Sequence, residues 1–212
     1  MGRIYSGYYA GIVLSYPADN PAIITGTVDG AQNGVVAPDE MHGGGNNWTI
    51  SNYGHVEGAG GYGIVLYSDH PGNVSGLITN GVHGTIAGLG GIAMSGGYDT
   101  VSNFGTVSGN TNNGVFLSNI GRVLVLNGSS TDTTARITGG PLHDGVFIDA
   151  GSYVTIGNQG IISGGYNGVQ VQNGLLPINI YNGGRGSNSA VIKGTDNGIY
   201  IGPAEFGIWG NL

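Results

Sequence analysis

The densest group of side chains that could carry out chemistry lies in one short stretch, Leu142-His-Asp-Gly-Val-Phe-Ile-Asp149. Within it, His143, Asp144 and Asp149 offer an imidazole and two carboxyl groups, and Asp196 adds a further carboxyl group. Imidazole and carboxyl groups are the usual proton donors and acceptors in catalysis. Two carboxylates about 6.5–9.5 Å apart can hydrolyse a glycosidic bond with inversion. Whether these groups could act together depends on the elements that position them.

Those elements form a repeat. A Gly followed by an apolar-x-apolar triplet occurs eight times, at intervals of 23 to 31 residues with a mean of about 27. A recurring unit of this length is typical of a solenoid, in which each unit buries its apolar face against its neighbours. The triplets follow Gly11, Gly34, Gly63, Gly91, Gly114, Gly145, Gly168 and Gly198.

Each repeat contains three short apolar segments separated by Gly and Asn. An apolar strand that ends in Asn comes first, a segment such as Thr106-Val-Ser-Gly109 comes second, and the Gly-apolar triplet comes third. No helical pattern lies between them. The sequence therefore predicts an all-β fold, a right-handed single-stranded parallel β-helix of about eight coils with three short strands each. We expect it to form one domain over residues 1–212.

The interior of this β-helix follows from strand alternation. The first and third residues of each triplet are apolar and point the same way, as in Val115 and Leu117, because side chains alternate along a strand. Stacked at about 4.8 Å per coil, these pairs would form one wall of a core about 35–40 Å long.

Six Asn residues recur at the end of the first strand, and we expect them to form a structural ladder at one corner. Each side-chain amide would then bond to the next coil. These residues are Asn52, Asn80, Asn103, Asn127, Asn158 and Asn182.

The same periodicity weakens the catalytic interpretation. Asp196 would lie about two coils, or ~10 Å, from Asp144, which is close to the upper end of the separation in inverting glycosidases. However, Asp144 takes the turn position at which other coils carry Asn33, Asn113, Asn167 and Asn197. Asp144 is therefore predicted to fill a turn, and we assign no catalytic residue. His143, Asp144, Asp149 and Asp196 remain the candidates of an alternative, enzymatic interpretation.

The middle residue of each triplet should point outward, yet it is mostly apolar. The row reads Val13, Val36, Val65, Ala93, Phe116, Phe147, Gln170 and Tyr200. A contiguous apolar stripe favours a contact surface for another protein chain, a covering segment or a sugar ring. Alternatively, strand propensity alone favours Val, Phe and Tyr at such positions. We take Val65, Phe116, Phe147 and Tyr200 as the main residues of a binding surface.

Composition excludes several functions. The net charge of −7 with five Lys and Arg leaves no basic patch for nucleic acid or anionic membranes. No apolar run of 18 residues is present, so we expect no membrane insertion by this segment. Cys is absent, which excludes disulfides and thiolate metal sites, and the five His show no metal-ligand spacing. We expect neither a metal nor a cofactor.

One phrase in the repeat resembles a known family. Asn103-Phe-Gly-Thr-Val-Ser-Gly109 followed by Asn113-Gly-Val-Phe-Leu117 is similar to the repeat of autotransporter passenger domains and related adhesins of Gram-negative bacteria. Residues 158–164 followed by 167–171 form a second copy, and the resemblance extends from about Arg3 to Gly207. It implies an extracellular or cell-surface location and export within a longer precursor. The resemblance is specific for the fold and only suggestive of the function, since such passengers include adhesins, self-associating proteins, toxins and enzymes.

The sequence therefore favours a non-enzymatic, extracellular β-helix that serves adhesion, self-association or a structural stalk. We expect its partner to be itself, through lateral or end-to-end contacts, or a surface glycan or protein. The alternative is a carbohydrate-active enzyme, a polysaccharide hydrolase or lyase similar to the pectin-lyase-like family. The chain ends in what reads as the start of another coil, so we expect a fragment of a longer protein.

Overall fold

The computed structural model describes residues 2–38, 47–67, 75–118, 121–149, 152–184 and 189–203. All regular elements in these residues are β-strands, and they stack in parallel as a β-solenoid, which is the predicted fold. No helix among the described residues is long and apolar enough to cross a membrane.

The first row of the solenoid is an eight-stranded sheet with one strand from each coil. The six coils between the two end coils are covered on both sides, so about six turns are enclosed, slightly fewer than the eight coils expected. The strands of the first row are β1 (Arg3–Tyr5), β4 (Ala22–Ile24), β7 (Asn47–Asn52), β9 (Ser75–Asn80), β11 (Tyr98–Asn103), β14 (Arg122–Asn127), β17 (Ser152–Asn158) and β20 (Leu175–Asn182).

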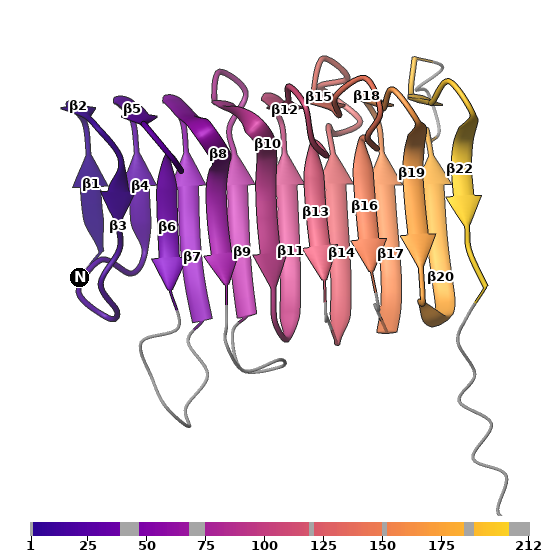
Figure 1. Ribbon diagram of the computed structural model, residues 1–212, viewed down its shortest axis with the longest axis horizontal. Helices are drawn as coiled ribbons and strands as arrows, with labels where there is room; N and C mark the ends of the chain where they lie inside the picture. Colours follow the sequence, from indigo (N-terminus) through magenta and orange to yellow (C-terminus); the bar gives the residue numbers. More distant parts are fainter. Residues whose placement is uncertain are drawn as a thin grey trace, which may run out of the picture.

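A second sheet folds around the remaining sides as two rows of strands. The second row contains β2 (Tyr8–Tyr9), β5 (Thr27–Gly30), the first halves of β8 (His55–Tyr67) and β10 (Thr85–Ser95), β12 (Thr106–Gly109), β15 (Arg136–Thr138), β18 (Ile161–Ser163) and β21 (Val191–Lys193). The third row contains β3 (Ile12–Val13), β6 (Val35–Pro38), the second halves of β8 and β10, β13 (Val115–Ser118), β16 (Val146–Asp149), β19 (Asn167–Gln172) and β22 (Asn197–Ile201). The first and third rows run in opposite directions, and the second row closes the upper edge (Figure 1).

In the third and fourth coils the second and third strands are not separated by a turn, contrary to the predicted three strands per coil. They continue as β8, of 13 residues, and β10, of 11 residues. The corner of β10 is rich in Gly, and the register with β8 shifts between Gly88 and Gly90. A Cβ at Gly88 would lie 2.6 Å from the carbonyl oxygens of Gly61 and Gly90. Only glycine therefore permits the backbone to pack this closely at the corner of β8 and β10.

The core lies between the three rows and is formed by the alternate residues that the triplets predict. In the fifth coil, Val101, Val107, Val115 and Leu117 are all fully buried. Burial of this kind is the main source of stability in such a fold, because an isolated coil has no interior. In the last coil, Ile199 and Ile201 are 44% and 53% exposed, since no further coil of the described residues covers them.

Candidate functional site

Among the four catalytic candidates, the structure separates Asp144 from Asp149 along the third row. Asp144 precedes β16 and Asp149 ends it, so five residues of extended chain, about 16 Å, separate the two carboxyl groups. Asp149 is partly exposed and accepts a hydrogen bond from the side-chain amide of Asn173 at 3.0 Å. This separation exceeds the range in which two carboxylates act on one glycosidic bond.

Asp144 is buried and forms part of a corner. Its Oδ1 accepts hydrogen bonds from the backbone and side-chain amides of Asn167, both at 2.9 Å, and its backbone amide donates to Asn113 at 2.9 Å. Burial raises the pKa of Asp144, and the bonds from Asn167 partly offset that rise. Asp144 therefore links three coils at the corner between the second and third rows, through its side chain to Asn167 and through its backbone amide to Asn113.

His143 and Asp196 occupy equivalent positions of that corner two coils apart. The backbone of Tyr166 lies between them, donating to the His143 carbonyl at 3.1 Å and accepting from the Asp196 amide at 3.0 Å. No hydrogen bond joins any two of the four candidate side chains in the described part of the chain.

The six Asn residues of the sequence pattern lie in one row at the corner between the first and second rows, and all of them except the terminal Asn182 are fully buried. Each side-chain Nδ2 donates to the Oδ1 of the next rung, at distances of 2.7 to 2.9 Å, from Asn52 through to Asn182. The same amides also reach backbone carbonyls of their own and the following coil, as Asn80 does to Gly84 and Thr106. The ladder therefore holds the corner together by bonds that run along the solenoid axis.

The middle residues of the triplets form one continuous row on the third row of strands, which we call the lateral stripe. They are apolar except for Gln170, which is buried. Strand register places one residue of each successive coil in this line, in the order Val36, Val65, Ala93, Phe116, Phe147, Gln170 and Tyr200. The rings of Phe116 and Phe147 stack with centroids 5.6 Å apart and planes 27° apart. Both rings are partly exposed, so this face presents aromatic surface to the outside.

A small depression of about 160 Å³ lies at the end of the lateral stripe. Its lining is polar and aromatic, and Gln170 accepts a hydrogen bond from the buried Asn167 amide at 2.7 Å. Tyr200 is 40% exposed and Tyr166 47% exposed. The depression is lined by Tyr166, Asn167, Gln170, Gln172, Asn197 and Tyr200.

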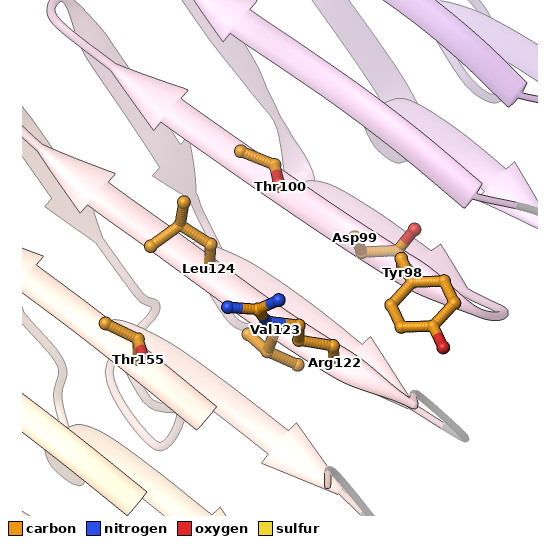
Figure 2. Close-up of a pocket in the computed structure, with 7 residues that line it drawn as sticks. All are labelled: Tyr98, Asp99, Thr100, Arg122, Val123, Leu124 and Thr155. Carbon is orange, nitrogen blue, oxygen red and sulfur yellow. The ribbon is translucent and has the colours of Figure 1, made fainter. Parts of the chain in front are cut away.

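A larger depression, of about 410 Å³, lies on the first row, across β11, β14 and β17 (Figure 2). Tyr98, which is 68% exposed, and the exposed Arg122 contribute to its open side. Asp99 also lines it but belongs to the inward-facing residues of β11, with 3% exposure.

Asp99 is a carboxyl group placed in the solenoid interior. Its Oδ1 accepts the backbone amide of Gly76 at 2.9 Å, whereas its Oδ2 is buried without a hydrogen-bond partner. Burial raises the pKa of Asp99 to about 7, although the Gly76 bond acts in the opposite direction. A perturbed pKa often marks a catalytic group, but here the group is among the inward-facing residues of its strand.

One cluster of potential ligands escaped the sequence analysis. Asp29 of β5 and His55 and Glu57 of β8 direct their side chains outward from the second row, and one ligand atom from each lies within 4.8 Å of the others. His55 Nε2 is 3.6 Å from Asp29 Oδ1 and 3.4 Å from Glu57 Oε2. The spacing of the five His gave no sign of this group, because its members come from neighbouring coils. Alignment of Thr27-Val-Asp-Gly30 with His55-Val-Glu-Gly58 would have placed the two carboxylates side by side.

Comparison of the chain with protein-family models, with curated proteins and with solved structures found no match.

Proposed function

We propose that this chain is a non-catalytic, extracellular β-solenoid that binds another protein chain or a glycan through its lateral stripe, in adhesion or self-association. The observation that carries the proposal is the in-register outer row that contains the stacked rings of Phe116 and Phe147. A solvated strand face would carry polar residues, as the neighbouring second row does with Ser108 and Thr138.

The geometry of the stripe suits lateral contact. Flat parallel strands expose the apolar side chains at about 4.8 Å intervals, so a partner strand, a second stripe or a row of sugar rings can meet several coils at once. Aromatic residues are enriched at protein interfaces because they bury a large area while losing few rotamers. The depression beside Tyr200 adds amide groups that could hydrogen-bond a polar ligand at one end of the stripe.

The test is self-association measured by light scattering from micromolar to millimolar protein. We expect oligomers at tens of micromolar or above, and the double variant Phe116→Lys with Phe147→Lys should shift association to at least tenfold higher concentration. The control is Ser108→Lys with Thr138→Lys, which adds the same charges to the same two coils on the adjacent face. If the chain is a monomer at millimolar concentration, the self-association form of the proposal is wrong.

The enzymatic alternative is tested separately. Incubation with a panel of plant and bacterial polysaccharides, followed by assays for new reducing ends and unsaturated products, should give no product. If a product forms and is lost in Asp149→Asn or Asp196→Asn, the chain is a carbohydrate-active enzyme instead. Binding of the same polysaccharides without cleavage, weakened by the Phe116/Phe147 variant, would support the glycan form of the proposal.

A further inference from the structure

We propose that Asp29, His55 and Glu57 form a binding site for a divalent transition-metal cation of the Zn²⁺ type on the outer face of the second row. This site goes beyond the proposed binding function, since it lies on a different row from the lateral stripe. It consists of one imidazole nitrogen and two carboxylate oxygens contributed by neighbouring coils.

The strand register explains why these groups converge. Asp29 and Glu57 are direct partners across β5 and β8, so their carboxylates stand side by side on the same face. His55 lies two residues before Glu57 on the same strand, and side chains two residues apart share a face. Like charges directly opposite each other destabilise a sheet unless a positive charge lies between them.

The described residues supply no such charge except His55. Among the described residues, ion pairs join Arg3 to Asp19 and His55 to the two carboxylates. No Lys or Arg of these residues forms an ion pair with Asp29 or Glu57. A cation bound at His55 Nε2 would offset the contact between the two carboxylates.

The distances suit ligands of a metal ion better than hydrogen-bonded partners. A charge-assisted N–H···O hydrogen bond is about 2.7–2.9 Å long, whereas the two separations from His55 Nε2 are 3.6 and 3.4 Å. A tetrahedral site with zinc bonds of about 2.0–2.2 Å has neighbouring ligands about 3.3–3.6 Å apart. His55 Nε2 is thus spaced from each carboxylate oxygen as ligands of one ion are, rather than as a donor is from its acceptor.

An independent observation concerns Asp29. Its side chain is 40% exposed as a whole, yet the Oδ1 atom, the one that faces His55, is shielded from water and accepts no hydrogen bond from the described part of the chain. A buried carboxylate oxygen without a donor is costly. A cation placed between Oδ1, Nε2 and the Glu57 carboxylate would satisfy this oxygen.

The other ring nitrogen of His55 is held from the next coil. Nδ1 lies 2.6 Å from the hydroxyl oxygen of Thr85, its register partner in β10. A metal-binding His commonly donates its second N–H to a neighbouring acceptor, which fixes the tautomer and leaves the first nitrogen free for the ion. If Nδ1–H donates to Thr85, the Nε2 lone pair points at the two carboxylates.

The ligand set determines the kind of ion. Imidazole with carboxylate suits Zn²⁺ and its neighbours in the first transition row, whereas Ca²⁺ prefers six to eight oxygen ligands. Three protein ligands leave one tetrahedral position for water.

The experiment is calorimetric titration of Zn²⁺ into the whole chain after removal of metal with a chelator. We expect a binding event that His55→Gln, Asp29→Asn and Glu57→Gln each weaken at least tenfold. The control is His83→Gln, which removes an exposed His outside the site and should leave the titration unchanged. Titration with Ca²⁺ should give at least tenfold weaker binding.

A second readout follows the imidazole directly. In nitrogen NMR of the histidine rings, Zn²⁺ should shift His55 Nε2 while Nδ1 keeps its proton, and Thr85→Val should weaken Zn²⁺ binding severalfold. The proposal is overturned if millimolar Zn²⁺ leaves the His55 signals unchanged, if His55→Gln binds as the parent chain does, or if Ca²⁺ binds as tightly as Zn²⁺.

Discussion

The side-chain amide of Asn103 donates to the side-chain Oδ1 of Asn127 at 2.8 Å across two adjacent coils, with both side chains fully buried. Asn103 also reaches the Gly105 and Arg136 carbonyls and accepts hydrogen bonds from Asn80 and from the Gly105 amide. This one residue therefore ties together three coils at a corner from which water is excluded.

Asn103→Ala should lower the free energy of unfolding by at least about 3 kcal/mol, because several buried groups lose their partner at about 1–3 kcal/mol each. Denaturant unfolding measures the change. Asn182→Ala, at the exposed end of the ladder, is the matched control and should cost less than about 1 kcal/mol. Equal losses at the two positions would show that burial does not set the strength of the ladder.

Leu117→Asp should prevent folding, whereas Phe116→Asp should not. Leu117 is fully buried in the core, where an unpaired charge has no compensating partner, and the adjacent Phe116 points outward. Phe116→Asp loses only the stack on Phe147, worth about 0.5–1.5 kcal/mol beyond buried area. Circular dichroism and thermal unfolding of both variants provide the measurement. The opposite ranking would contradict the register of β13.

Asp99 should make the protein less stable as pH rises. Its pKa is about 7 in the folded state against a reference of 3.8, so the folded chain holds this proton more tightly than the unfolded chain. The contribution of protonated Asp99 to the free energy of unfolding is therefore complete below about pH 4 and is lost as pH rises towards 7. A shift of this size corresponds to a loss of about 4 kcal/mol.

Asp99→Asn removes the titration while keeping an oxygen that can accept the Gly76 amide. The free energy of unfolding of the variant should be close to that of the parent chain at pH 4 and a few kcal/mol higher than it at pH 8. Urea unfolding at both pH values measures the difference. A constant difference between the two proteins across this range would rule out a raised pKa at Asp99.

The insertion in the sixth coil should be dispensable. Residues 128–134 form a loop closed by backbone hydrogen bonds between Ser129 and Asp132, and the loop is followed by the buried Ala135, whose carbonyl accepts the Ile161 amide. We expect that replacing residues 128–135 with Phe-Gly, the short connection of the fifth coil, leaves the fold intact and changes stability by less than about 1 kcal/mol.

Thermal unfolding tests this replacement. Deletion of residues 136–138 instead is the control, since it removes β15 from between β12 and β18 and should destabilise the chain strongly. A replacement as harmful as this deletion would show that the loop stabilises the solenoid.

Much of the fold could be predicted from the sequence because strand alternation is local. A triplet such as Gly114-Val-Phe-Leu117 already determines that Val115 and Leu117 face one side and Phe116 the other. Repetition of the triplet then predicts stacking, and Asn at a constant position predicts a ladder. In all these cases the same residue type recurs at the same place in each coil, so a repeat in the sequence places equivalent side chains in one row of the solenoid.

The contacts between unlike residues of neighbouring coils were decided by the tertiary structure alone. Coil length and corner geometry set which residue of one coil lies beside which residue of the next, and these brought Asp29, His55 and Glu57 together although no local motif joins them. The same geometry enclosed Asp99 in the core. Charge, burial and ligand distance depend on three-dimensional neighbours, whereas alternation depends only on the chain itself.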